Sequence, residues 1–226
     1  IRARQAMSTA RVQAKTKSQK TSRAEGARFG ATPLGRRIVV SDLLQAVEYL
    51  DQKNVDEIHR AYRFGEGAHA GQARQSGEAY IHHPLAVACI LADLHLDGRS
   101  IIAAILHDVI EDTPIARVQL VEEFGEEVAQ LVDGVTKIGQ IEFESTEHAE
   151  AENFHKMLLS MSRDIRVILI KLADRIHNMR TLDSLKVDKR RRIARQTLEI
   201  FAPIANRLGL HTWTQELEDL SFRNLY

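Results

Sequence analysis

Apolar residues recur with helical spacing along most of the chain, and the clearest case is Ala103–Thr113, which reads AAILHDVIEDT. Pro and Gly are absent from this stretch, and at about 100° per residue its side chains separate into two faces. One face is apolar. The opposite arc, roughly 140° wide, carries four ionisable residues: His107, Asp108, Glu111 and Asp112. We therefore expect a helix with one buried side and one side able to do chemistry, or simply to meet water.

The same periodicity predicts further helices on both sides of this stretch. Ser41 and Asp42 suit a helix N-terminus, and Pro84 suits the first turn of another helix. Gly125 separates two short helices, and Pro203 predicts a kink in the last one. Because no run alternates with a period of two, we expect an all-α fold. The predicted helices cover Leu43–Leu50, Val55–His69, Leu85–Leu94, Ile115–Phe124, Glu126–Val135, Ala151–Met161, Asp164–Leu182 and Asp188–Leu208.

Charge divides the chain into two parts. Residues 1–40 contain ten Lys and Arg and one acidic residue, so the remaining 186 residues carry 21 basic and 30 acidic residues, a net charge of −9. The basic segment shows almost no apolar periodicity, and we expect a disordered leader there, with nucleic-acid binding as the less favoured alternative. Gly139–Glu150 is acidic and polar and predicts a mobile loop. The acidic body makes nucleic acid an unexpected partner for the folded domain.

The single cysteine, Cys89, lies in an apolar run and has no internal partner for a disulfide. A reducing compartment is the expected setting. No apolar run is long enough to span a bilayer, and the chain shows no signal-peptide pattern. We therefore expect a cytoplasmic protein with no membrane partner.

A second set of polar residues lies on the segment Asp164–Leu182, whose middle, VILIKLA, is apolar nearly all round and predicts a core helix. Asp174, His177, Asn178 and Thr181 follow one another at helical offsets. Buried polar groups need partners, which could be one another or a bound cation. A cation would explain both helices together, with ligands from three segments: His83, His107, Asp108 and Asp174.

The order His, His-Asp and a distant Asp resembles the HD-superfamily phosphohydrolases, which are helical bundles. The segments HAGQARQSGEAYIHHPLAVACILADL, AAILHDVIEDT, LVDGVTKI and DIRVILIKLADRIHNMRTL together resemble the hydrolase domain of the RelA/SpoT family of alarmone enzymes. The resemblance covers the chain from about Leu43 onward. It selects His83 rather than His82 as the ligand, because His83 directly precedes Pro84 as in the family.

The resemblance implies hydrolysis of the 3′-pyrophosphate of guanosine tetra- or pentaphosphate, (p)ppGpp, to GDP or GTP and pyrophosphate. It also implies Mn²⁺ held by His83, His107, Asp108 and Asp174, with Glu111 and Asp112 activating and orienting water. Substrate contacts are expected from Arg74 and Ser76 near the guanine and from Asn178 and Thr181 near the ribose and phosphates. Lys137, Lys171 and Arg175 are further bases, for which we favour surface or ion-pair roles.

Family members continue into a synthetase domain and regulatory domains, which are therefore expected partners of this one. The resemblance divides the chain into a leader at 1–40, a hydrolase domain at 41–208, and the beginning of a connection to the synthetase domain at 209–226. Two alternatives remain open: an HD enzyme for another nucleotide, and a module that binds (p)ppGpp without cleaving it.

Overall fold

The computed structural model describes residues 37–139 and 164–226, and within them the prediction of an all-α fold is confirmed. The nearest approach to a sheet in these two ranges is an isolated antiparallel bridge between Ala73 and Ala79. The α-helices are α2 (Val40–Ala46), α3 (Gln52–Ala68), α4 (His82–Ala92), α5 (Gly98–Leu106), α6 (Val109–Asp112), α7 (Arg117–Gly139), α9 (Ile165–Arg180), α10 (Val187–Gln196), α11 (Ala202–Arg207) and α12 (His211–Leu225). Two further short helices are the 3₁₀-helix η2 (Leu182–Ser184) and the π-helix η3 (Thr197–Phe201).

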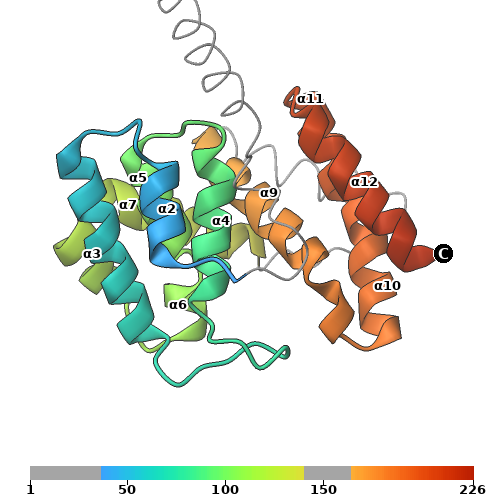
Figure 1. The fold of residues 1–226 in the computed structure, drawn as a ribbon, viewed down its shortest axis with the longest axis horizontal. Helices are drawn as coiled ribbons and strands as arrows, with labels where there is room; N and C mark the ends of the chain where they lie inside the picture. The colour runs from blue at the N-terminus through green and yellow to red at the C-terminus, as the bar shows by residue number, and fades with distance from the viewer. Residues whose placement is uncertain (1–36, 140–163) are drawn as a thin grey trace, which may run out of the picture.

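Helix α9 lies between two groups of helices (Figure 1). On one side it packs against α4, α5 and α7; on the other it packs against α12 and η3. Both α4 and the middle of α9 are buried nearly all round, and α4 is buried at every position from His83 to Ala92. This is the packing expected for helices with apolar residues on all faces, and it brings the polar residues of α9 into the core.

The predicted helix Ala103–Thr113 is two helices in the structure. Helix α5 ends at Leu106, and α6 begins at Val109. Asp108 has φ −97° and ψ −4°, which interrupts the regular helix between them. The prediction of a single continuous helix was therefore wrong at this point, because periodicity continues across a short break of this kind. The break lies at the two residues that the sequence singled out for chemistry.

Other boundaries differ by a few residues. Helix α2 has Val39 rather than Ser41 or Asp42 as its N-cap, and Asp42 instead accepts a hydrogen bond from the Val39 N–H at 2.9 Å. Gly125, with φ 83° and ψ 166°, divides α7 at the position where a separation was predicted. The kink predicted at Pro203 is a π-helical turn, η3, that directly precedes α11. Pro203 cannot donate a backbone hydrogen bond, so the regular pattern is lost one turn before it.

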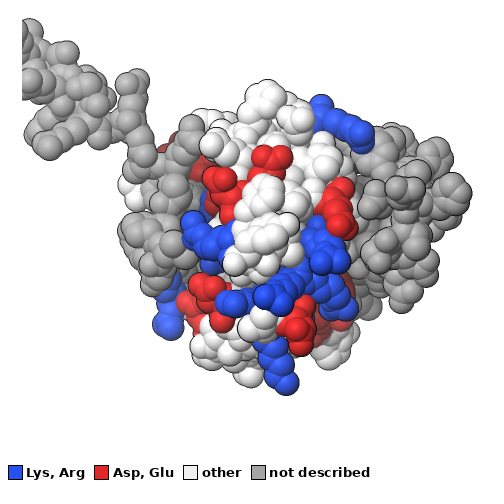
Figure 2. All heavy atoms as spheres, turned by 90° about the vertical axis from the view of Figure 1, so that its right-hand side faces the viewer, with Lys and Arg blue, Asp and Glu red and all other residues white. Residues whose placement is uncertain are grey.

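The C-terminal helices pack against the rest of the domain. Trp213 and Leu217 of α12 are buried, and Arg180 of α9 forms two hydrogen bonds to the Glu216 carboxylate, at 2.6 and 2.9 Å. Figure 2 shows that Lys and Arg are interspersed with Asp and Glu on the face that α10 to α12 present. Residues 211–225 are therefore part of this packed unit, and their predicted role as the beginning of a connection stays a prediction.

Some predictions fall on other parts of the chain. The basic leader lies outside the described residues except for 37–40, as do the acidic loop beyond Gly139 and the predicted helix Ala151–Met161. Among the helices that are described, none is both long and apolar enough to cross a membrane.

Candidate metal centre

Four side chains predicted as metal ligands converge between α4, α9 and the junction of α5 and α6. The Nε2 atom of His83 lies 3.2 Å from Asp174 Oδ1 and 3.7 Å from Asp108 Oδ2. The Nε2 atom of His107 lies 3.1 Å from Asp108 Oδ1 and 3.9 Å from Asp174 Oδ1. One ligand atom each from His83, His107 and Asp174 can be chosen so that all three lie within 4.8 Å of one another. We call His83, His107, Asp108 and Asp174 the His–Asp cluster.

Each member of the His–Asp cluster is held by its helix. His83 is in the first turn of α4, His107 directly follows α5, and Asp174 lies in the middle of α9, where an apolar helix passes through the core. His83, His107 and Asp174 are all buried, and the Asp108 side chain is 15% exposed. Because the surroundings are well packed, these side chains have little freedom to turn away from one another.

The two ring nitrogens of His107 have different surroundings, and these favour a positive charge beside Nε2. Its Nδ1 donates to the Ala104 carbonyl oxygen at 2.8 Å, which leaves the Nε2 lone pair directed into the cluster in the neutral ring. This Nε2 atom is buried and makes no hydrogen bond of acceptable geometry in the part of the chain that the structure describes. A lone pair facing two carboxylates requires a positive charge between them, which a proton or a metal ion can supply.

The tautomer of His83 follows from its neighbours. Arg74 Nη1 lies 3.4 Å from His177 Nδ1, and a guanidinium can only donate, so this His177 nitrogen is an acceptor. His83 Nδ1 lies 2.7 Å from the same nitrogen and must be the donor. The Nε2 atom of His83 therefore also directs a lone pair at Asp174. Both histidines of the His–Asp cluster thus direct Nε2 into it, His83 with a free lone pair and His107 with a lone pair that becomes available when Nε2 loses its proton.

Burial and charge shift the pKa values of the cluster in opposite directions. Burial acts to lower the pKa of His107, but the Asp108 carboxylate outweighs it and raises this pKa to about 9. Burial also lowers the pKa of His83. For Asp174 burial opposes ionisation, and the Lys171 ammonium and the two histidines outweigh it, so its pKa lies well below the usual range. Without a metal, His107 therefore carries a proton at neutral pH that a cation would displace.

Glu111 and Asp112, which we call the acidic pair, lie on α6, which directly follows His107 and Asp108. Both are exposed, and the pKa of Glu111 is raised by its partial burial and by the charge of Asp108. Asp112 Oδ2 accepts a hydrogen bond from the Tyr80 hydroxyl at 2.7 Å, and the same hydroxyl lies 2.7 Å from Asp108 Oδ2. Asp112 is therefore linked to Asp108 of the cluster through one hydroxyl, and Glu111 precedes it on α6.

Three of the four predicted substrate residues form one network with the cluster. Arg74 donates to Asn178 Oδ1 and, at 3.3 Å, to Thr181 Oγ1. Asn178 Nδ2 in turn donates to Asp174 Oδ1 at 2.6 Å. Ser76, by contrast, is exposed near the tip of the loop, one residue before Gly77 with its φ of 82°. The structure brings Arg74, Asn178 and Thr181 together and leaves Ser76 outside this network.

Two of the three further bases, Lys171 and Lys137, form the ion pairs that we favoured, and Arg175 instead lies over an aromatic ring. Lys171 Nζ lies 2.8 Å from Asp174 Oδ2, and Lys137 Nζ lies 2.7 Å from Asp133 Oδ2. The Arg175 guanidinium lies 4.0 Å from the centre of the Phe201 ring, a cation–π contact. Lys171 is therefore an ion-pair partner of the cluster itself.

Two residues near the cluster were not predicted. Tyr80 touches Asp108 and Asp112 from the loop, and His177 touches His83 from α9. The sequence did contain one signal for His177, its place in the polar line with Asp174 and Asn178 on an otherwise apolar helix. For Tyr80 there was no comparable signal, because its contacts are made across the fold.

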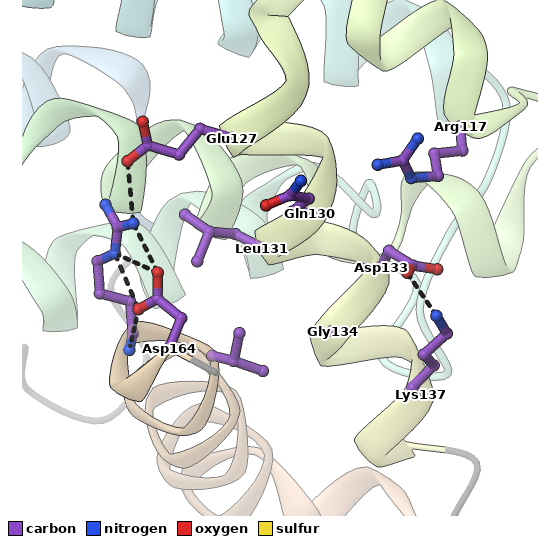
Figure 3. A pocket seen from close by; sticks show the side chains of 10 residues that line it. Arg117, Glu127, Gln130, Leu131, Asp133, Gly134, Lys137 and Asp164 are labelled. Atoms are coloured by element: carbon purple, nitrogen blue, oxygen red, sulfur yellow. Dashed lines mark hydrogen bonds and ion pairs between the residues drawn. The ribbon is translucent and has the colours of Figure 1, made fainter. Parts of the chain in front are cut away.

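A cavity of about 840 Å³ lies elsewhere, between α7 and the beginning of α9 (Figure 3). No member of the His–Asp cluster lines it. Its charged side chains pair with one another or nearby: Arg166 with Asp164 and Glu127, and Lys137 with Asp133. Among residues 37–139 and 164–226, the cavity has no convergent unpaired groups for a ligand, so the chemistry of the cluster identifies the candidate site.

Comparison with known proteins agrees with this geometry. A family model described as "HD domain" matches residues 61–211. The chain is 56% identical over 178 residues to the bifunctional (p)ppGpp synthase/hydrolase SpoT of Escherichia coli K12, covering 79% of this chain and 25% of that protein. It is 61% identical over 159 residues to the guanosine-3′,5′-bis(diphosphate) 3′-pyrophosphohydrolase of Haemophilus influenzae, covering 70% of this chain and 24% of that protein.

A solved structure of a metazoan SpoT orthologue, described as hydrolysing ppGpp, superposes with a TM-score of 0.50 at 24% identity. The match covers 73% of this chain and 85% of that one. At this identity the likeness concerns the fold alone. The chain spans about a quarter of the length of the curated relatives that it matches.

Proposed function

The chain belongs to the HD-domain family, and from this premise we propose that it is a metal-dependent hydrolase of the 3′-pyrophosphate of (p)ppGpp. The products would be GDP or GTP and pyrophosphate. The observation that carries the proposal is the convergence of the His–Asp cluster beside an intact acidic pair. The names of relatives that are 54–61% identical over most of this chain support the choice of substrate.

The proposed cofactor is Mn²⁺, held by His83, His107, Asp108 and Asp174. Two imidazole nitrogens and carboxylate oxygens form a donor set of intermediate hardness, which suits this ion. When bound, such a cation lowers the pKa of water and neutralises charge on a phosphoryl group. Four protein ligands leave coordination positions open, as hydrolysis requires.

The acidic pair would accept the proton of the attacking water and orient it. Water attacks the phosphorus bonded to O3′, the P–O3′ bond breaks, O3′ takes a proton, and pyrophosphate leaves. Glu111 is suited to accept a proton because its pKa is raised by burial and by Asp108, which brings it closer to neutrality. Asp112 contributes an acceptor that is already held in place by Tyr80. We assign proton transfer to the two residues jointly.

The nucleotide would lie against Arg74, Asn178 and Thr181, with Ser76 reaching it from the exposed loop. The Arg74 guanidinium can stack on a base and pair with phosphate, and it is already positioned by Asn178 and Thr181. Because Asn178 also donates to Asp174, substrate contacts and metal ligands share one hydrogen-bonded network. Residues on α9 would therefore orient substrate and metal together.

We further propose that this domain works as part of a longer polypeptide with synthetase and regulatory domains. The support is that relatives such as the E. coli protein are about four times as long as the matching region, and that protein is named for both synthase and hydrolase activities. A cytoplasmic location stays a prediction.

The test is pyrophosphate release from ppGpp by the purified chain with Mn²⁺, with the nucleotide product identified by chromatography. Asp108→Ala and His83→Ala should lose both bound Mn²⁺ and hydrolysis, because each removes a ligand. Glu111→Ala and Asp112→Ala should keep Mn²⁺ and lower kcat by about 100-fold or more, since general acid–base catalysis contributes on that order.

His82→Ala is the matched control. His82 is adjacent to His83, but its Nδ1 contacts the Ile38 carbonyl oxygen at 2.8 Å, away from the cluster. This variant should bind Mn²⁺ like the wild type. Wild-type hydrolysis by Asp108→Ala would refute the metal assignment. Binding of ppGpp without pyrophosphate release would indicate a sensing module, and turnover of NADPH in place of ppGpp would indicate another HD enzyme.

A further inference from the structure

We propose that Tyr80 is a positioning residue that holds Asp112 in place relative to Asp108, and this inference rests on the proposed function. The Tyr80 hydroxyl lies 2.7 Å from Asp108 Oδ2 and 2.7 Å from Asp112 Oδ2. One hydroxyl therefore links a proposed metal ligand to a member of the acidic pair. Tyr80 itself belongs to neither group and comes from a different part of the chain.

The Tyr80 ring is held from several directions. Its ring stacks on His69, with the centroids 4.5 Å apart and the planes 23° apart. Its backbone N–H donates to the Gln72 carbonyl at 3.1 Å, and its carbonyl accepts from the His83 N–H at 3.0 Å. The hydroxyl is thus fixed by the ring and the backbone, so it can impose a position on the carboxylates rather than follow them.

The segment that carries Tyr80 makes a second contact with Asp112. Gln72 Nε2 donates to the Asp112 backbone carbonyl at 2.8 Å, and Gln72 Oε1 lies 2.9 Å from His69 Nδ1. His69, Gln72 and Tyr80 therefore form a support that holds both the main chain and the side chain of Asp112. Helix α6 is only four residues long, so it needs such external contacts to keep its acidic residues in place.

The Tyr80 hydroxyl has one hydrogen, so which carboxylate accepts it matters. A phenol has one hydrogen, so it donates to one of the two carboxylates at a time. With a cation bound, Asp108 would be a weaker acceptor, because part of its charge would be taken up, and the hydroxyl would donate to Asp112. This leaves Asp112 Oδ1 as the atom available to orient water, with its direction set by Tyr80.

The experiment is the Tyr80→Phe variant, which removes the hydroxyl and keeps the ring that stacks on His69. We expect kcat for ppGpp to fall about 10-fold to 100-fold, the usual cost of losing an outer-sphere hydrogen bond at a metal site. KM should stay within about threefold, because the contact acts on the attacking side rather than on substrate binding. The Mn²⁺ Kd, measured by electron paramagnetic resonance, should stay within about fivefold of the wild-type value.

Tyr62→Phe is the matched control, because the Tyr62 hydroxyl also donates to a carboxylate, that of Glu66, one turn away on α3. It should keep wild-type kcat and KM. A double-mutant cycle then separates positioning from general loss of structure. In the Asp112→Ala background, Tyr80→Phe should lower kcat by less than about twofold, because its partner is already missing.

The inference is overturned if Tyr80→Phe keeps kcat within about twofold of the wild type, or if its effect adds in full to that of Asp112→Ala. It is equally overturned if Tyr80→Phe weakens Mn²⁺ binding by more than about fivefold, since Tyr80 would then act through Asp108 as a support of the metal. Failure of the wild-type chain to release pyrophosphate would instead refute the proposed function, so the two failures are distinguishable.

Discussion

At the scale of single residues, the candidate site depends on which nitrogen of each histidine carries a proton. His107 Nδ1 is committed to the Ala104 carbonyl, and His83 Nδ1 is committed to His177. Both Nε2 atoms consequently face the carboxylates. Such outer contacts commonly decide how well a histidine binds a metal.

His177→Leu tests this role. The substitution removes the acceptor for His83 Nδ1 and keeps a side chain of moderate size, so the Mn²⁺ Kd should rise about 10-fold to 100-fold. Electron paramagnetic resonance titration of free Mn²⁺ measures it. The control is His59→Leu on α3, where the ring contacts Tyr62 and no member of the cluster. Equal Mn²⁺ affinity in the two variants would contradict the role of His177.

At the scale of helices, α7 and α9 approach each other closely at one glycine. A Cβ atom added to Gly134 would lie 2.9 Å from Val167 Cγ2 and 3.1 Å from Val167 Cγ1. Real Cβ contacts are almost never so short, so the glycine allows the two helices to pack at this distance. The contact matters for the site because α9 carries Asp174.

Gly134→Ala should therefore destabilise the domain. Overpacking of this kind costs about 1–3 kcal/mol, which for a chain of this size corresponds to a fall in Tm of about 2–12 °C. Thermal unfolding followed by circular dichroism measures it. Gly67→Ala is the control, because a Cβ at that helical position would meet no atom within 4 Å. It should leave Tm unchanged or raise it by the ordinary helical preference for alanine over glycine. A Gly134→Ala protein as stable as the wild type would show that α9 can shift at no cost.

At the scale of the whole molecule, the cluster joins elements that are distant in sequence. The contact between His83 Nε2 and Asp174 connects α4 to α9, and the contact between His107 Nε2 and Asp108 lies where α5 and α6 meet. A cation at this point would exist only in the folded protein. Metal binding and folding should therefore be coupled.

Mn²⁺ should raise the stability of the chain. At a concentration 100 times its Kd, a ligand that binds only the folded state adds about 2.7 kcal/mol to the free energy of unfolding. Thermal unfolding with Mn²⁺ and with excess EDTA measures the difference. Asp108→Ala should show no such shift, because it has lost a ligand. An equal shift in that variant would mean that Mn²⁺ binds elsewhere.

Local sequence information predicted most of the helices because each depends on the spacing of its own apolar residues. It predicted the apolar α9 with its polar line, and the separation at Gly125, where φ is positive. It failed at the break between α5 and α6, since the same periodicity continues across His107 and Asp108. The order of ligand types along the chain also identified candidates for the cluster.

What the chain alone determined is most of the helices, without α12, and the residue types available for chemistry. Only the tertiary structure decided which lone pairs face one another, that Tyr80 bridges Asp108 and Asp112, and that His177 supports His83. These contacts join residues separated by 28, 32 and 94 positions. No local periodicity encodes such distances, because they are set by how the helices pack around a common core.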